Sequence, residues 1–240
     1  MVGPEVTPEQ GVTRYQTDAT QGPACAISAG AATVYRNYFA TVGGSIGQTR
    51  DRQLDGLADV GAALHEVIAR PEVPLWTMRN GYALCTADGL SEIGHHLRQA
   101  DARALDALRG QLAIGVHRDV AVTDVRSAEP PVVTQVYGSA LPIAYSGIAP
   151  QAWEPFARLV LEAAYEATLL AALEQALRGA SRTVLLTSLG GGAFGNPGEW
   201  IESAICGALD KVRAEGLDVR LVSYGSIHPG MRRIEEGWQA

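Results

Sequence analysis

Residues 184–196 read Val-Leu-Leu-Thr-Ser-Leu-Gly-Gly-Gly-Ala-Phe-Gly-Asn, and this stretch decides the fold. Its first half is rich in strand-forming residues, and glycines at 190, 192 and 195 follow in the spacing G-x-G-x-x-G. A loop of this kind, between a strand and a helix, turns backbone amides toward an anion. We therefore predict a strand that ends in an anion-cradling loop, Gly190 to Asn196. The alternative, in which the glycines only form a tight turn, stays open.

The residues after the loop predict the start of a helix. Asn196 is a favourable cap, Pro197 suits the first helical position, and Glu199 completes the spacing of a capping box. The apolar spacing that follows predicts a helix over 197–213.

Working outward, the last third of the chain alternates between helix and strand. A long amphipathic helix over 153–177 precedes the strand at 183–189, and a strand at 219–224 follows the helix at 197–213. Such alternation predicts parallel pairing with crossover connections. Upstream, the patterns predict helices at 23–39, 54–68 and 90–108, and strands at 75–78, 82–86 and 132–137, with a hairpin turn at Asn80-Gly81. Strands are also predicted over 114–125, with a break near Arg118-Asp119. The expected fold class is α/β, with a mixed central sheet flanked by helices.

Composition limits the function classes. The chain of 240 residues has a net charge of −7 and no Lys/Arg cluster, which disfavours a nucleic-acid polymer as partner. It has no long apolar run and no leader pattern, so we expect no membrane association and a cytoplasmic location. Cys25, Cys85 and Cys206 are too far apart for a metal knuckle, and we interpret them as small buried hydrophobic residues. We expect neither a metal nor a cofactor.

The glycine-rich stretch resembles the macrodomains, whose last third commonly runs strand, glycine-rich loop with an aromatic residue, helix and final strand. The matching residues are 184–197, the helix with Trp200, Ile201, Ala204 and Ile205, and the strand 217–224. A looser similarity covers 18–39, where Gln21 and Gly22 open a second glycine-containing turn into a helix. The resemblance implies a three-layer α/β/α macrodomain-like fold for the single domain 1–240, with residues 40–150 as a family-specific insertion.

The resemblance also implies a ligand, ADP-ribose or a related nucleotide diphosphate, free or on an ADP-ribosylated substrate. By this resemblance, Phe194 would pack on the distal ribose and Tyr224 would face the adenine. The diphosphate would be held by Gln21 and Gly22 together with Gly190, Gly191, Gly192, Ala193, Gly195 and Asn196. If the protein is an enzyme, it would be an ADP-ribosyl glycohydrolase-like hydrolase, with Asp18 as the candidate catalytic acid.

This sequence departs from the hydrolytic macrodomains at the start of the first helix. Ala24, Cys25 and Ala26 occupy the positions where those enzymes place an acid. A non-catalytic nucleotide-binding or interaction module therefore remains open. An NAD-dependent Rossmann oxidoreductase is less favoured, because the strand that ends at Val222-Ser223-Tyr224 has no acid for the ribose hydroxyls.

Other polar residues have ordinary structural interpretations. His95 and His96 are expected on a solvated helix surface, and His228 is a weak candidate near the end of the last strand. Glu162 and Glu166 lie one helical turn apart and are expected to form a solvated stripe.

Overall fold

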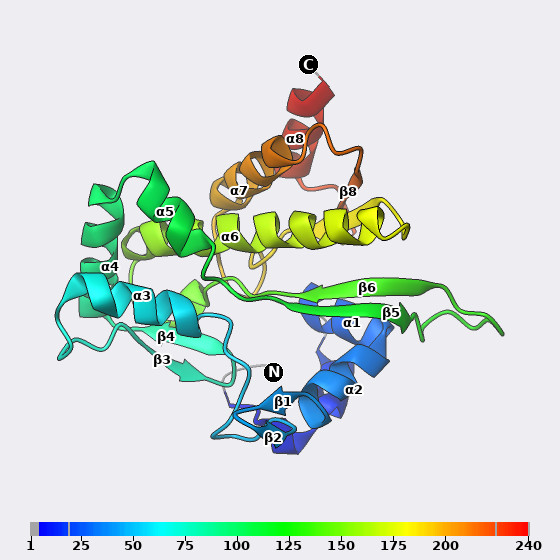
Figure 1. Ribbon diagram of the computed structural model, residues 1–240, viewed down its shortest axis with the longest axis horizontal. Helices are drawn as coiled ribbons and strands as arrows, with labels where there is room; N and C mark the ends of the chain where they lie inside the picture. The colour runs from blue at the N-terminus through cyan, green and yellow to red at the C-terminus, as the bar shows by residue number, and fades with distance from the viewer. Residues whose placement is uncertain (1–4, 19, 224, 240) are drawn as a thin grey trace. The chain divides into compact units, whose positions relative to one another are not determined.

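The computed structural model describes residues 5–18, 20–223 and 225–239, which fold into helices and small sheets (Figure 1). The chain divides into two compact units. The first unit comprises residues 1–56, 76–84 and 115–137, and the second comprises 57–75, 85–114 and 138–240. The mixed helix and strand composition is as predicted. The single domain with an insertion stays a prediction.

In the described residues of the first unit, the chain forms two short 3₁₀ helices, two α-helices and three hairpins. Its elements are η1 (Pro8–Gln10), η2 (Val12–Thr17), α1 (Gln21–Ser28), α2 (Gly30–Tyr38), β1 (Thr41–Val42), β2 (Ser45–Ile46), β3 (Trp76–Arg79), β4 (Tyr82–Cys85), β5 (Gly115–Ala121) and β6 (Val132–Tyr137).

The helix predicted over 23–39 is divided in two at Ala29, whose backbone leaves the helical region at φ −120° and ψ 64°. The carbonyl of Ser28 accepts a hydrogen bond of 2.7 Å from the amide of Thr123, a residue that follows β5. This contact across the chain stabilises the break, and the sequence pattern contains no sign of it.

Two hairpins of the first unit follow local sequence signals. Asn80 and Gly81 both have positive φ, 49° and 82°, which is the conformation of the type I′ turn expected for an Asn-Gly pair. In the antiparallel pair β5–β6, the register shifts between His117 and Val120, and Asp119 has a φ of 55°. The predicted break in this strand is therefore a bulge.

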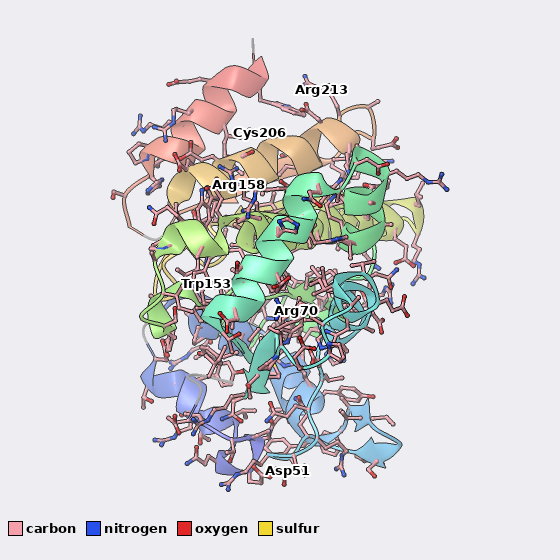
Figure 2. All side chains as sticks on the ribbon, turned by 90° about the vertical axis from the view of Figure 1, so that its left-hand side faces the viewer. Asp51, Arg70, Trp153, Arg158, Cys206 and Arg213 are labelled. Carbon is pink, nitrogen blue, oxygen red and sulfur yellow. The ribbon has the colours of Figure 1, made fainter. Side chains whose placement is uncertain are left out.

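The second unit is mainly helical. Its elements are α3 (Ala58–Ile68), α4 (Ala87–Gln99), α5 (Ala102–Arg109), η3 (Ile143–Tyr145), α6 (Pro150–Leu177), β7 (Thr183–Thr187), α7 (Gly198–Lys211), β8 (Asp218–Val222) and α8 (Pro229–Gln239). Helix α6 packs against both α4 and α7. It buries Trp153, Phe156, Leu161 and Leu169 almost completely, and Figure 2 labels Trp153 on this helix. Because α6 packs against other helices and buries large apolar side chains, it forms the centre of this unit's core.

The strands do not join into one central sheet. In the part of the chain that the structure describes, they form four two-stranded sheets, β1–β2, β3–β4, β5–β6 and β7–β8. Three of these pairs are hairpins, in which a turn or loop alone joins the two strands, and short connections of this kind lose the least loop entropy. The pair β7–β8 is parallel, in register from Thr183 with Asp218 to Thr187 with Val222, and so confirms the predicted parallel pairing.

Candidate functional site

The glycine loop, Leu189 to Asn196, joins the end of β7 to the start of α7, as the sequence predicts. Gly190 and Gly195 have positive φ, 75° and 73°. A Cβ at Gly190 would lie 2.4 Å from the Cβ of Ala140, and one at Gly195 would lie 3.0 Å from the Cβ of Ala144. Both positions therefore require glycine for the conformation and packing of the loop itself.

The central glycines differ from these two. Neither Gly191 nor Gly192 has a positive φ. A Cβ at Gly191 would meet Ile201 at 3.1 Å, whereas one at Gly192 would have no atom within 4 Å among the described residues. The absence of a side chain at Gly192 thus has no steric cause within the described structure, and the loop surface is left open there.

Tyr165 of α6 holds the base of the loop. Its hydroxyl donates to the carbonyl of Thr187 (2.7 Å) and accepts from the amide of Leu189 (2.8 Å). Burial raises the pKa of Tyr165, so the phenol stays neutral and can make both bonds. No local pattern singles out Tyr165 in the sequence, because its position on the helix is typical of an ordinary core residue.

Asn196 is not the cap of α7, which corrects the prediction. Its side chain is buried, and its Nδ2 donates to the carbonyls of Leu141 (2.9 Å) and Gly190 (3.3 Å). The cap position is Pro197, without a side-chain cap bond. The side-chain amide of Asn196 thus ties the loop to itself and to the segment before η3. It does not cap the backbone amides at the start of α7.

The backbone amides of the loop fall into two groups. Those of Leu189, Gly191, Gly195 and Asn196 donate to groups of the protein. Those of Gly190, Gly192 and Ala193 donate to no group of the residues described, and of these three residues Gly192 and Ala193 are exposed. Two neighbouring amides on an exposed loop can bind an anionic oxygen. The carboxylate of Glu199, exposed in the first turn of α7, opposes such binding.

An aromatic pair lies beside these amides. The rings of Phe194 and Tyr145 meet edge to face, with centroids 5.8 Å apart and planes at 81°. The amide of Ala144 donates to the carbonyl of Phe194 at 3.0 Å, which ties the loop to the η3 segment. Phe194 is half-buried and Tyr145 is 43% exposed, so the pair presents part of its surface to solvent.

The remaining predicted ligand-binding residues lie elsewhere in the chain. Gln21 and Gly22 form the start of α1 in the first unit, and Gly22 is exposed. Asp18 accepts two hydrogen bonds from Thr20, from its amide (2.8 Å) and its hydroxyl (2.5 Å), and so forms a local turn before α1. Tyr224 lies outside the described residues.

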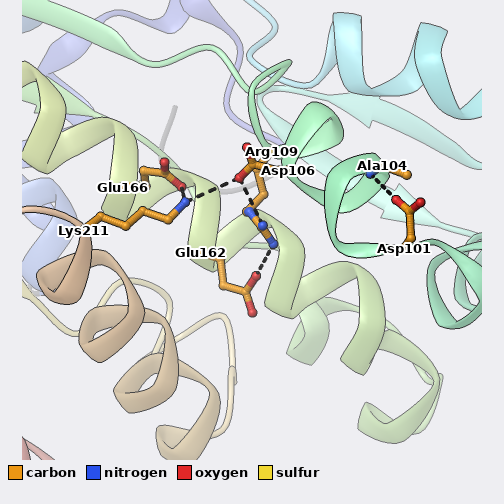
Figure 3. A network of polar contacts seen from close by, with 7 residues as sticks. All are labelled: Asp101, Ala104, Asp106, Arg109, Glu162, Glu166 and Lys211. Carbon is orange, nitrogen blue, oxygen red and sulfur yellow. Dashed lines mark hydrogen bonds and ion pairs between the residues drawn. The ribbon is translucent and has the colours of Figure 1, made fainter.

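Glu162 and Glu166 do not form a solvated stripe. Glu162 is paired with Arg109 (3.0 Å), and Glu166 with Lys211 (2.5 Å), as Figure 3 shows. Asp106 contacts both cations, at 3.2 Å from Arg109 and 3.5 Å from Lys211. This network joins α5, α6 and α7, and its role is structural because every charge in it has a partner of opposite sign.

The cysteines and histidines agree with their predicted environments only in part. Cys85 is buried as predicted, whereas Cys25 and Cys206 are exposed. His95 is exposed on α4, and His228 is exposed with its Nδ1 accepting from the amide of Gly230. Among the described residues, no group of His, Cys, Asp and Glu is arranged to hold a metal.

No protein-family model, no curated protein and no solved structure matches this chain. Within the described ranges, none of the helices combines the length and the apolar character needed to cross a bilayer.

Proposed function

We propose that this protein binds ADP-ribose or a related nucleotide diphosphate at the glycine loop between β7 and α7. The observation that carries the proposal is the pair of exposed amides at Gly192 and Ala193, in a loop whose shape depends on glycine at 190 and 195. Because a diphosphate has several acceptor oxygens close together, it can bond to both amides at once. The resemblance to macrodomains supplies the identity of the ligand.

The surroundings of the loop support a nucleotide in preference to a free phosphate. The edge-to-face pair of Phe194 and Tyr145 offers a partly exposed aromatic surface next to the amides. A ribose or a base packed there would bury apolar area and add to the affinity. This contact would also offset the like charge of Glu199 in the first turn of α7.

A second candidate is a binding module without catalysis, and one observation favours it. The Asp18 carboxylate, the candidate acid, is engaged with the amide and hydroxyl of Thr20. The first residues of α1 bring no other acid, since Ala24, Cys25 and Ala26 stand there. In a hydrolase, an acid would activate the water that attacks the anomeric carbon of the distal ribose.

Calorimetric titration tests the proposal. ADP-ribose is expected to bind, ADP to bind more weakly, and adenosine, which has no phosphate, to give no signal. A bound ligand also raises the melting temperature, by an amount that grows with the logarithm of the ligand concentration above the dissociation constant. Absence of both heat and thermal shift with millimolar ADP-ribose would refute the proposal. Release of ADP-ribose from an ADP-ribosylated protein, lost in Asp18→Ala, would establish hydrolysis over simple binding.

A further inference from the structure

A polar cleft lies within the first unit, separate in sequence from the glycine loop. It has a volume of about 560 Å³, and its lining consists of Glu5, Thr7, Arg50, Asp51, Gln53 and Asp55, together with Met78, Arg79 and Asn80 at the β3–β4 hairpin. Among the described residues that line it, Met78 is the one apolar residue. Clefts of this size hold small molecules, and a lining of this kind suits a charged, hydrophilic one.

One wall of the cleft is a tight turn that carries two opposite charges. Thr49 and Arg52 exchange backbone hydrogen bonds of 2.8 and 3.2 Å, which places Arg50 and Asp51 at the tip. The carboxylate of Glu9 accepts from the amide of Arg50 at 2.7 Å and holds the turn in place. Figure 2 labels Asp51. The backbone that presents the two charges is therefore fixed before any ligand arrives.

The side chains of Arg50 and Asp51 do not neutralise each other. Although they are adjacent in sequence, neither forms an ion pair or a side-chain hydrogen bond with the residues that the structure describes. The charge of Arg50 acts on Glu9 through space and contributes, after the hydrogen bond from the Arg50 amide, to a lowered pKa of that carboxyl. The turn thus presents one cation and one anion that are each available to a ligand.

The other walls have their polar groups paired. Arg79 binds Glu5 at 2.5 Å, and the Nε2 of Gln53 donates to the Oδ1 of Asn80 at 2.9 Å. Asn80 is buried and sits in the I′ turn of the hairpin, so this wall is anchored. Asp55, the remaining acid of the lining, also has an interaction within the described residues. The charges of Arg50 and Asp51 are consequently the groups that select the ligand.

We propose that the cleft binds a small zwitterion of the class of free amino acids. Arg50 recognises the carboxylate of the ligand, because a guanidinium binds a carboxylate through two parallel hydrogen bonds. Asp51 accepts hydrogen bonds from the ammonium group. A ligand with both charges gives each side chain a partner of opposite charge. A simple anion would be repelled by Asp51, and a simple cation would be repelled by Arg50.

Calorimetric titration of the full chain with L-serine, L-glutamate and L-arginine tests the proposal. The amino acid that binds best is then compared with its methyl ester, which lacks the carboxylate, and with its N-acetyl derivative, which lacks the ammonium. Each derivative is expected to bind at least tenfold more weakly. No heat with any of the three amino acids at millimolar concentration overturns the proposal and identifies the cleft as a hydrated surface only.

Two variants assign the roles. Arg50→Gln should remove the advantage of the free acid over the ester, and Asp51→Asn should remove the advantage of the free amine over the acetylated form. Matched controls are Arg103→Gln and Asp124→Asn, which change exposed charges outside the cleft and should leave binding unaltered. If the amino acid binds equally well to both cleft variants, its site is elsewhere and the proposal is wrong.

Discussion

Replacement of Gly192 by valine separates a ligand-binding role of the glycine loop from a structural one. The residue is exposed, its φ is not positive, and an added Cβ meets no described atom within 4 Å. We therefore expect the free energy of unfolding to change by no more than about 0.5 kcal/mol, as for an ordinary surface substitution. The branched side chain would nevertheless cover the amides of Gly192 and Ala193.

The expected loss of binding follows from those two amides. A hydrogen bond to a charged group contributes about 1.5 kcal/mol or more, so losing two weakens binding by about 3 kcal/mol. Since each 1.4 kcal/mol corresponds to a factor of ten, the dissociation constant for ADP-ribose should rise about a hundredfold. Calorimetry measures this change, and thermal melting without ligand checks the fold.

Two controls make the result interpretable. Gly207→Val makes the same change on α7, also with no described atom within 4 Å of the new Cβ, and should leave ADP-ribose binding unaltered. Gly190→Ala places a Cβ 2.4 Å from Ala140 at a φ of 75° and should destabilise the fold by about 2 kcal/mol or more. If Gly192→Val binds ADP-ribose as tightly as the parent, the loop is a structural turn and the reasoning fails.

Four further outcomes follow from the second unit. Tyr165→Phe should lower the free energy of unfolding by about 1–3 kcal/mol in urea titrations, because it removes both hydrogen bonds of the hydroxyl and leaves the Leu189 amide only its bond to the Thr187 carbonyl. An unchanged midpoint would contradict this. Glu199→Gln should bind ADP-ribose a few-fold more tightly at low salt and show little gain at high salt, since it removes a like charge. The pKa of Asp106 is lowered, chiefly by the hydrogen bond from Arg109, so the contribution of this carboxylate to stability is present at neutral pH and is lost as the pH falls through that lowered pKa. Arg109→Gln should therefore destabilise the protein more at pH 7 than at about pH 2. An equal loss of stability at both pH values would exclude the ion pair as the cause. Burial raises the pKa of Cys85 to about 12, so a thiol reagent should modify the two exposed cysteines in the folded protein and Cys85 only on unfolding.

The sequence by itself determined the features that depend on neighbours along the chain. The I′ turn at Asn80-Gly81 forms because these two residues tolerate positive φ, whatever surrounds them. The strand, glycine loop and helix in the order β7, loop, α7 follow from propensity and from the glycine spacing. The parallel pairing of β7 with β8 follows from a helix of sufficient length between two apolar strands.

Only the tertiary structure decided how side chains far apart in sequence are used. Asn196 has every local property of a helix cap, yet its amide bonds to Leu141 and Gly190, because a buried donor bonds to the carbonyls that packing brings near. Tyr165 looks like a core residue until the fold brings its hydroxyl to the base of the loop. The turn at Arg50 and Asp51 becomes one wall of a cleft only when the β3–β4 hairpin provides another. Hydrogen bonds and clefts of this kind depend on positions in space, and a local sequence pattern carries no record of them.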